Sequence, residues 1–345
     1  MAKSKHTILP QATVLLAGNF RQELESGTVT EDLIDELLGE LSRLPAKAVG
    51  QAEIQLPWCA GLHMRHSHHL PGGGFWAGFP PERNLLGRYP QIAWLFLFHR
   101  DGYVRQAALD MLGEPPMSPF FLAAVILRMN DWVEPVRLAA TFRFRMLMLS
   151  TPPEMIVAAG PFLLDRWRSW RRWTDESVSL LDTLFARPDV ALALCERLIS
   201  GTEGSLGREM ANALRKSGLD AHLGRLARSA RSPFVRMIAL KTQIEQRTTW
   251  PCGFERQWVD KAYGVSRRVA LFDHRPIEAE LSATAAIRLG LRDKSVIVRR
   301  MAADAFTERA GLFDDADALI ETMRGDRSPG IRERADYLIR HRIEA

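Results

Sequence analysis

Residues 293–302, DKSVIVRRMA, show the pattern that decides the fold. Asp293 stands six residues before Arg299, and Ala302 follows that arginine three residues later. An aspartate can accept hydrogen bonds from the free amides at a helix start, and an alanine lets a neighbouring helix cross closely. The pattern therefore predicts a capped turn followed by a tightly packed helix, and it occurs again at residues 131–140, 165–174 and 326–335.

The arginine and the small residue behind it recur along most of the chain. Successive arginines of this kind are 28 to 37 residues apart, and they are Arg105, Arg137, Arg171, Arg208, Arg236, Arg267, Arg299 and Arg332. A period of this length is typical of a solenoid, whose units bury a core only when they stack. We expect each arginine to be partly buried and to bond an aspartate or a carbonyl of a neighbouring turn. The predicted ladder consists of Asp131, Arg137, Asp165, Arg171, Asp293, Arg299, Asp326 and Arg332.

These residues resemble the HEAT-repeat family, whose two-helix units carry such an aspartate and arginine around the inner turn and the start of the second helix. The resemblance covers roughly residues 86–345. The aspartate is missing from four units, where the chain has His99, Thr202, Ala230 and Lys261 instead. The resemblance implies an all-α fold, an α-solenoid of about eight HEAT-like two-helix repeats with an irregular N-terminal segment.

The sequence predicts three regions. Residues 1–57 are expected to form an N-terminal helical end unit, and residues 86–345 the HEAT-like repeat solenoid. Between them, residues 58–85 are rich in glycine, histidine and aromatic residues, which predicts a loop or arm that covers the end of the solenoid or captures a partner. Alternating strand patterns closed by Asn-Gly or Asp-Gly turns are absent, so we expect helices almost everywhere.

Composition indicates a folded, non-membrane protein with a modest positive charge. The net charge is +5, and the three cysteines, Cys59, Cys195 and Cys252, are too scattered for a disulfide framework or a zinc knuckle. No stretch is long enough for a transmembrane helix, and the N-terminus lacks a convincing signal peptide. We therefore expect a cytoplasmic location and no contact with a membrane.

The densest basic and aromatic stretch is residues 166–173, RWRSWRRW. Interleaved arginines and indoles can neutralise phosphates and stack on bases, although an ordinary turn between repeats is the simpler explanation of the stretch. The repeat register assigns Trp170 to the core and Arg171 to the ladder. The candidate residues for nucleic acid or another partner, including a second basic region at residues 208–247, are Arg166, Trp167, Arg168, Arg172, Arg215, Lys216, Arg225 and Arg228.

A cluster of histidines gives a weak indication of a metal site. His63, His66 and His68 lie in the irregular segment, but no carboxylate stands between Glu53 and Glu82, and the spacing matches no known metal motif. We interpret the cluster as a solvated loop, and predict neither a metal nor another cofactor.

Three classes of function remain open. Motifs for nucleotide binding or nucleophilic catalysis are absent, so the leading hypothesis is a noncatalytic scaffold that holds a protein partner on the concave face of the solenoid, as a subunit of a larger complex. The second is a nucleic-acid-binding protein with a basic groove. The third is a DNA glycosylase, because some HEAT-like proteins remove alkylated bases with a carboxylate and tryptophans, which Trp167, Trp170, Trp173 and Asp175 resemble.

Overall fold

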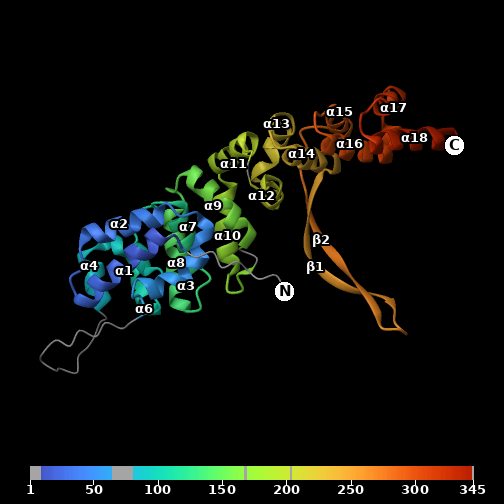
Figure 1. Cartoon of the computed structure of the whole chain (residues 1–345). Coiled ribbons are helices and arrows are strands. Elements are labelled where there is room, and N and C mark those ends of the chain that lie inside the picture. The colour runs from blue at the N-terminus through green and yellow to red at the C-terminus, as the bar shows by residue number, and fades with distance from the viewer. Residues whose placement is uncertain (1–8, 64–80, 167–168, 203, 344–345) are drawn as a thin grey trace, which may run out of the picture. The chain divides into compact units, whose positions relative to one another are not determined.

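The computed structural model describes residues 9–63, 81–166, 169–202 and 204–343 of the chain. These residues are mostly helical, as predicted, and they belong to two compact units, Met1–Leu184 and Phe185–Ala345 (Figure 1). The elements of the first unit are α1 (Gln11–Ser26), α2 (Glu31–Ser42), η1 (Ala46–Ala48), α3 (Val49–Cys59), α4 (Pro81–Arg88), η2 (Pro90–Ile92), α5 (Ala93–Phe96), α6 (Gly102–Met111), α7 (Pro119–Arg128), α8 (Glu134–Leu147), α9 (Pro153–Arg166) and most of α10 (Asp175–Ala186).

The second unit contains the remaining helices and two strands. They are α11 (Pro188–Ser200), α12 (Leu206–Ala213), η4 (Ser217–His222), α13 (Leu223–Ser229), α14 (Pro233–Glu245), β1 (Arg247–Asp260), β2 (Val265–Pro276), α15 (Ala283–Leu291), α16 (Val296–Arg309), η5 (Ala310–Leu312), α17 (Ala316–Arg324) and α18 (Pro329–Ile343).

Local signals explain where many helices begin. Proline occupies one of the first two positions of α7, α8, α11 and α14, where its missing N–H costs nothing. At the start of α7, the Ser118 hydroxyl also accepts a hydrogen bond from the N–H of Phe121. The helix expected after the turn at Asp293 is α16, which begins at Val296 and ends at Arg309.

The core of the first unit is centred on α7, which is buried around nearly its whole circumference. Helices α2 and α3 pack against α7, as does η1. The N-terminal helices, predicted as an end unit of their own, therefore share one compact unit with the helices that follow. The predicted irregular arm is also shorter, because α3 continues to Cys59 and α4 begins at Pro81; residues 64–80 lie outside the described part of the chain.

In the second unit, the arginine-bearing helices pack in series. Helix α14 contacts α13, α15 and α16, and α16 in turn contacts α15 and α18. The small residue predicted to allow close crossing does so between α15 and α16, because a Cβ placed on Gly290 would lie 2.7 Å from the Cβ of Ala302. A larger side chain at either position would push the two helices apart.

The expectation that Arg267 belongs to a helical repeat is wrong, because residues 247–276 are not helical. These residues form an antiparallel hairpin of β1 and β2, a long two-stranded ribbon in Figure 1. The turn is closed by Asp260, whose Oδ1 accepts the N–H groups of Ala262 and Tyr263, and by Gly264 in the left-handed region at φ 66°. Arg267, predicted as a repeat arginine, lies in β2 and has no helix to occupy.

The hairpin is inserted between two helices that otherwise follow the regular spacing. Arg236 bonds Asp293, 57 residues further along, whereas Arg299 bonds Asp326, which is 27 residues away. Without the 30 residues from Arg247 to Pro276, the first separation would also be 27. Because the inserted hairpin is nearly as long as one repeat, its Arg267 imitates the repeat spacing.

None of the helices in the described ranges combines the length and the apolar character that crossing a bilayer requires.

Candidate functional site

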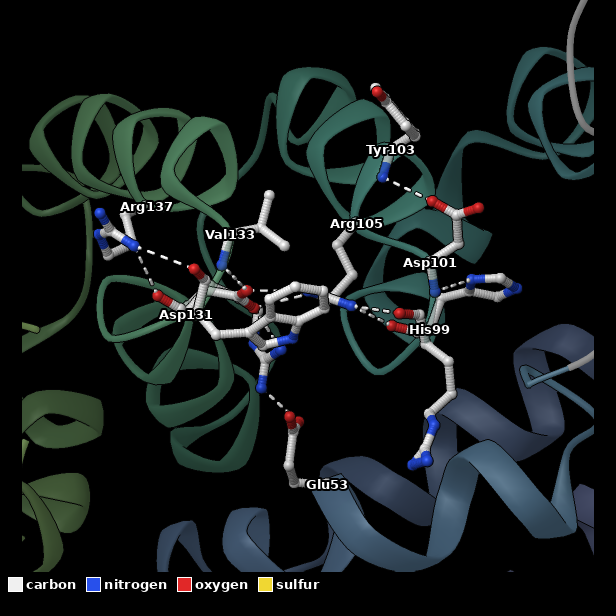
Figure 2. A network of polar contacts seen from close by, with 11 residues as sticks. Glu53, His99, Asp101, Tyr103, Arg105, Asp131, Val133 and Arg137 are labelled. Atoms are coloured by element: carbon white, nitrogen blue, oxygen red, sulfur yellow. Dashed lines mark hydrogen bonds and ion pairs between the residues drawn. The ribbon is translucent and has the colours of Figure 1, made fainter.

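A network of arginines surrounds the buried carboxylate of Asp131 (Figure 2). Arg105 donates from Nε to Oδ2 at 2.9 Å and from Nη2 to Oδ1 at 2.8 Å, so the pair is bidentate. Its Nη1 donates to the carbonyls of His99 and Arg100 at 2.7 and 2.9 Å. Arg128 donates to Asp131 at 2.8 Å and also pairs with Glu53. Four of the five N–H donors of the Arg105 guanidinium are therefore used.

The same arrangement occurs twice in the second unit. Arg236 makes a bidentate pair with Asp293 at 2.7 and 2.8 Å, and Arg299 makes one with Asp326 at 2.7 and 3.1 Å. In both cases Nη1 donates to the carbonyls six and five residues before the arginine. In all three cases the aspartate pairs with an arginine of an earlier helix: Asp131 with Arg105, Asp293 with Arg236 and Asp326 with Arg299.

Each of these aspartates also caps its own turn. The Oδ1 atoms of Asp131, Asp293 and Asp326 accept the N–H of the residue two positions later, at 2.9, 2.7 and 2.7 Å. Burial raises the pKa of Asp131, but the hydrogen bonds from Arg105 and the charge of Arg128 outweigh burial and hold that pKa below its usual value. The hydrogen bonds from Arg299 lower the pKa of Asp326. The aspartates are consequently ionised and fully used in holding the fold.

Other predicted ladder residues take part differently. Arg137 and Arg332 each donate to the carbonyls of their own turn, at 3.0 and 3.3 Å and at 2.8 and 3.1 Å. Arg171 was expected near the start of a helix, but it lies exposed in the turn between α9 and α10, and Asp165 lies exposed near the end of α9. The register fails there because α9 continues through Arg166 instead of ending before Asp165. Arg208, another repeat arginine, is exposed on α12.

The predicted basic and aromatic cluster is only partly described. Arg166 and Arg172 are exposed, while Trp167 and Arg168 lie outside the described residues. Trp170 is half-buried rather than in the core, with its ring 5.0 Å from that of Trp173 and 6.2 Å from that of Phe162. Asp175, the carboxylate of the glycosylase hypothesis, is the exposed first residue of α10.

The second group of predicted basic contacts is largely occupied by acids or by the fold. Arg225 pairs with Glu196 at 2.6 Å, and Arg228 pairs with Glu280 at 3.0 Å. Arg215 and Lys216 are half-buried in the turn after α12. These residues therefore do not gather into a free basic groove in the second unit.

The histidines give no metal site within the described residues. His63 places its Nδ1 2.8 Å from the carbonyl of Pro57, and its ring lies 4.4 Å from that of Trp58. His66 and His68 are outside the described part of the chain. A cavity of about 590 Å³ adjoins His63 in the first unit, between the start of α6 and the start of α8, and its walls include His99, Tyr103 and Trp132.

Basic and aromatic side chains instead gather on the hairpin that the sequence did not predict. Phe254, Arg256 and Trp258 alternate along β1 and so share one face. Arg268, the cross-strand partner of Arg256, lies on the same face. Arg256 covers the ring of Trp258 at 4.3 Å and Arg268 covers the ring of Phe254 at 4.5 Å, measured from the guanidinium carbon to the ring centre.

The hairpin is exposed on both faces. Of its two strands, only Thr248 at the base is buried. Phe254 is 60% exposed and Phe272 62% exposed, which is far more than aromatic side chains show in a strand that covers a core. The residues from Arg247 to Pro276 include six basic and three acidic side chains.

The base of the hairpin is fixed to the helices by Arg275. Its guanidinium donates to the carbonyls of Leu214 and Lys216 at 2.8 and 2.6 Å, and to both carboxylate oxygens of Asp220 at 2.7 Å. The N–H of Ile277 donates to the carbonyl of Gln246 at 3.1 Å and closes the ribbon. The hairpin thus has an anchored base and an exposed outer part.

Comparison with models of known protein families and with curated proteins finds no match for this chain.

Proposed function

We propose that this protein is a noncatalytic binding protein in which HEAT-like helical repeats hold a basic hairpin that contacts nucleic acid. The observation that carries the proposal is the exposed face of Phe254, Arg256, Trp258 and Arg268. The proposal therefore places the nucleic-acid contact on the hairpin of β1 and β2, and not in the basic groove expected from the sequence.

The repeated arginine geometry supports the solenoid part of the proposal. Five arginines, in both units, donate to the carbonyls six and five residues before them, and three of these pair with an aspartate further along the chain. A stacked array requires such a recurring contact between neighbouring units, since each unit is too small to be stable alone.

The physical state of the hairpin supports a binding role. A two-stranded hairpin is only marginally stable in water, and this one leaves large apolar side chains exposed on both strands. An exposed cluster of aromatic and apolar groups is normally covered by a partner. The accompanying arginines favour a polyanion, because a guanidinium forms strong charge-assisted hydrogen bonds with phosphate.

A shortened hairpin tests the proposal. Thr249 and His274 are cross-strand partners, so the residues from Trp250 to Asp273 can be replaced by Asn-Gly, which forms a tight hairpin turn. We expect the intact protein to bind fluorescent DNA or RNA in a strongly salt-dependent manner, measured by anisotropy, and the shortened protein to lose this binding. Undiminished binding by the shortened protein would move the contact elsewhere.

The comparison variant is Arg172→Glu, which reverses a charge in the cluster predicted from the sequence. Arg172 is exposed in the first unit, so the substitution should leave the fold intact. If the hairpin carries the contact, this variant should bind nearly as well as the intact protein. A loss confined to Arg172→Glu would favour the cluster at residues 166–173.

The protein-scaffold hypothesis keeps a specific observation in its favour. Leu138, Phe142 and Met146 follow each other at one-turn spacing on α8 and are 55% to 64% exposed. Such an apolar stripe suits a protein partner. Changing Leu138 and Phe142 to serine should leave nucleic-acid binding intact, and loss of a stoichiometric copurifying protein in that variant would identify a second binding surface.

The absence of catalysis is tested directly on alkylated duplex DNA. We expect no release of a modified base, because Asp175 is exposed to solvent at the start of α10, and a catalytic carboxylate needs an environment that shifts its pKa. Robust release by the intact protein, abolished by Asp175→Asn, would establish the glycosylase alternative.

A further inference from the structure

We infer that the hairpin is a ribbon that enters the major groove of double-stranded DNA, with the face of Phe254, Arg256, Trp258 and Arg268 toward the bases and phosphates. The inference rests on the proposed function and names its ligand.

The charge arrangement of this face calls for an anionic ligand. Arg256 and Arg268 stand directly opposite each other, and two like charges in that position destabilise an antiparallel pair. Neither forms an ion pair with an acid in the described part of the chain; Arg256 donates to the Ser266 hydroxyl at 2.7 Å, and each guanidinium lies on an aromatic ring. Phosphate oxygens would relieve the repulsion and accept the remaining N–H donors.

The two faces of the ribbon differ in charge, and this difference indicates which face approaches DNA. Glu255, Gln257 and Arg267 lie on the opposite face, where Arg267 donates to the side-chain oxygen of Gln257 at 2.8 Å. Only that face carries a carboxylate along this stretch. The face without an acid is therefore the one that approaches DNA.

The dimensions of the ribbon favour the major groove of B-form DNA. Two paired strands are about 4.8 Å apart, and the groove, roughly 12 Å wide, admits a two-stranded ribbon with its side chains. The five residues from Phe254 to Trp258 span roughly 15 Å, less than half a helical turn of DNA, so a straight ribbon can follow the groove over that length. The deep, narrow major groove of duplex RNA excludes such an element.

Single strands are disfavoured for a different reason. Proteins that bind single strands stack bases on open aromatic rings. On this face the rings of Phe254 and Trp258 each have one side covered by a guanidinium, at 4.5 and 4.3 Å, so a base can stack on that side only by displacing the arginine. The arrangement presents positive charge where a protein that binds single strands presents a fully open ring.

The test uses the full chain, with three probes and two matched double variants. The probes are a fluorescent DNA duplex of about 20 base pairs, its single strand and the corresponding RNA duplex, compared at about 0.15 M salt and over a salt series. The test variant carries Arg256→Gln and Arg268→Gln. The control carries Arg300→Gln and Arg327→Gln, which remove the same charge from two exposed positions of the same unit, one on α16 and one in the turn before α18.

We expect tighter binding to the DNA duplex than to either other probe. The hairpin variant should lose about tenfold or more in duplex affinity, and the slope of log K against log salt should become shallower by roughly 1.8, whereas the control should change neither as much. Bound protein should also protect guanine N7, which lies in the major groove, from methylation, and the hairpin variant should not.

The outcomes separate the inference from the proposed function. Equal or tighter binding to single strands or to duplex RNA, or an effect of the control equal to that of the hairpin variant, would overturn the groove assignment while the protein remained a nucleic-acid-binding protein. Failure to bind any of the three probes would sink both. Arg256 and Arg268 are exposed, so we expect their substitution to leave the fold intact. Circular dichroism of each variant checks this.

Discussion

At the scale of single residues, three arginines each link the turn before their own helix to a later turn that carries an aspartate. The planar guanidinium of an arginine has donors in two directions, so Nε and Nη2 can bind a carboxylate while Nη1 binds carbonyls. Arg105, Arg236 and Arg299 use both directions. A lysine in the same place would supply one charge without the fork, so it could not hold both groups.

Removing the guanidinium from Arg299 should destabilise the protein. We expect Arg299→Ala to lower the free energy of unfolding by about 1 to 3 kcal/mol, because the half-buried Asp326 carboxylate loses its bidentate partner. Arg332→Ala is the matched control, since Arg332 donates only to carbonyls and is exposed, and its effect should be smaller. Urea unfolding measures both; equal effects, or none, would contradict a stabilising ladder.

The same pair should make stability depend on pH. Because Arg299 lowers the pKa of Asp326 below 3.8, the pair stabilises the fold fully above that value and loses its contribution as the pH falls through the lowered pKa. The stability difference between the intact protein and Asp326→Asn should therefore shrink as the pH is lowered from neutral toward about 3. A constant difference for Asp326→Asn over this pH range would refute the linkage.

At the scale of elements, the hairpin and the helices are stabilised in different ways. The helices bury an apolar side against neighbouring helices. The hairpin is held instead by the pairing of its two strands and by the contacts at its base. Anchoring at Arg275 keeps the ribbon attached without a core beneath it. An element of this kind can be changed without repacking the helices.

The shortened hairpin, with Asn-Gly in place of the residues from Trp250 to Asp273, should therefore melt like the intact protein. We expect a change in unfolding free energy below about 1 kcal/mol, because only exposed or half-buried side chains are removed. Arg275→Ala should cost more, about 1 to 3 kcal/mol, since Asp220 and the Leu214 and Lys216 carbonyls lose their donor. Thermal denaturation compares the two; a larger loss in the shortened protein would show that the ribbon supports the helices.

At the scale of the whole molecule, stability should be divided between the two compact units. Arg105 and Asp131 pair within the first unit, and Arg236 and Asp293 within the second. In arrays with contacts mainly between neighbours, a weakened contact opens nearby elements before distant ones.

Hydrogen exchange should detect this division. Arg105→Ala should speed amide exchange in α6 and α8 and leave α14, α16 and α18 nearly unchanged, because the lost pair lies in the first unit. Arg236→Ala should give the opposite pattern. Mass spectrometry of peptides measures the exchange along the chain. Uniformly faster amide exchange in either variant would indicate a single cooperative body.

The sequence by itself determined the helices and their capped turns, since these depend on contacts within a few residues. The start of α16, the aspartate caps at Asp131, Asp293 and Asp326, and the close alanine at Ala302 were all readable from a short window. The repeat period also singled out Arg299 and Asp326, whereas their pairing with each other is visible only in the structure.

Only the tertiary structure decided the hairpin and, with it, the candidate site. A strand is recognised in sequence by alternating apolar and polar residues, and that alternation arises when one face of a sheet is buried. The strands from Arg247 to Asp260 and from Val265 to Pro276 bury neither face, so their sequence carries no such period. The sequence also could not show which arginines are neutralised by an acid. Arg228 pairs with Glu280, 52 residues away, whereas the residue opposite Arg256 is another arginine, Arg268.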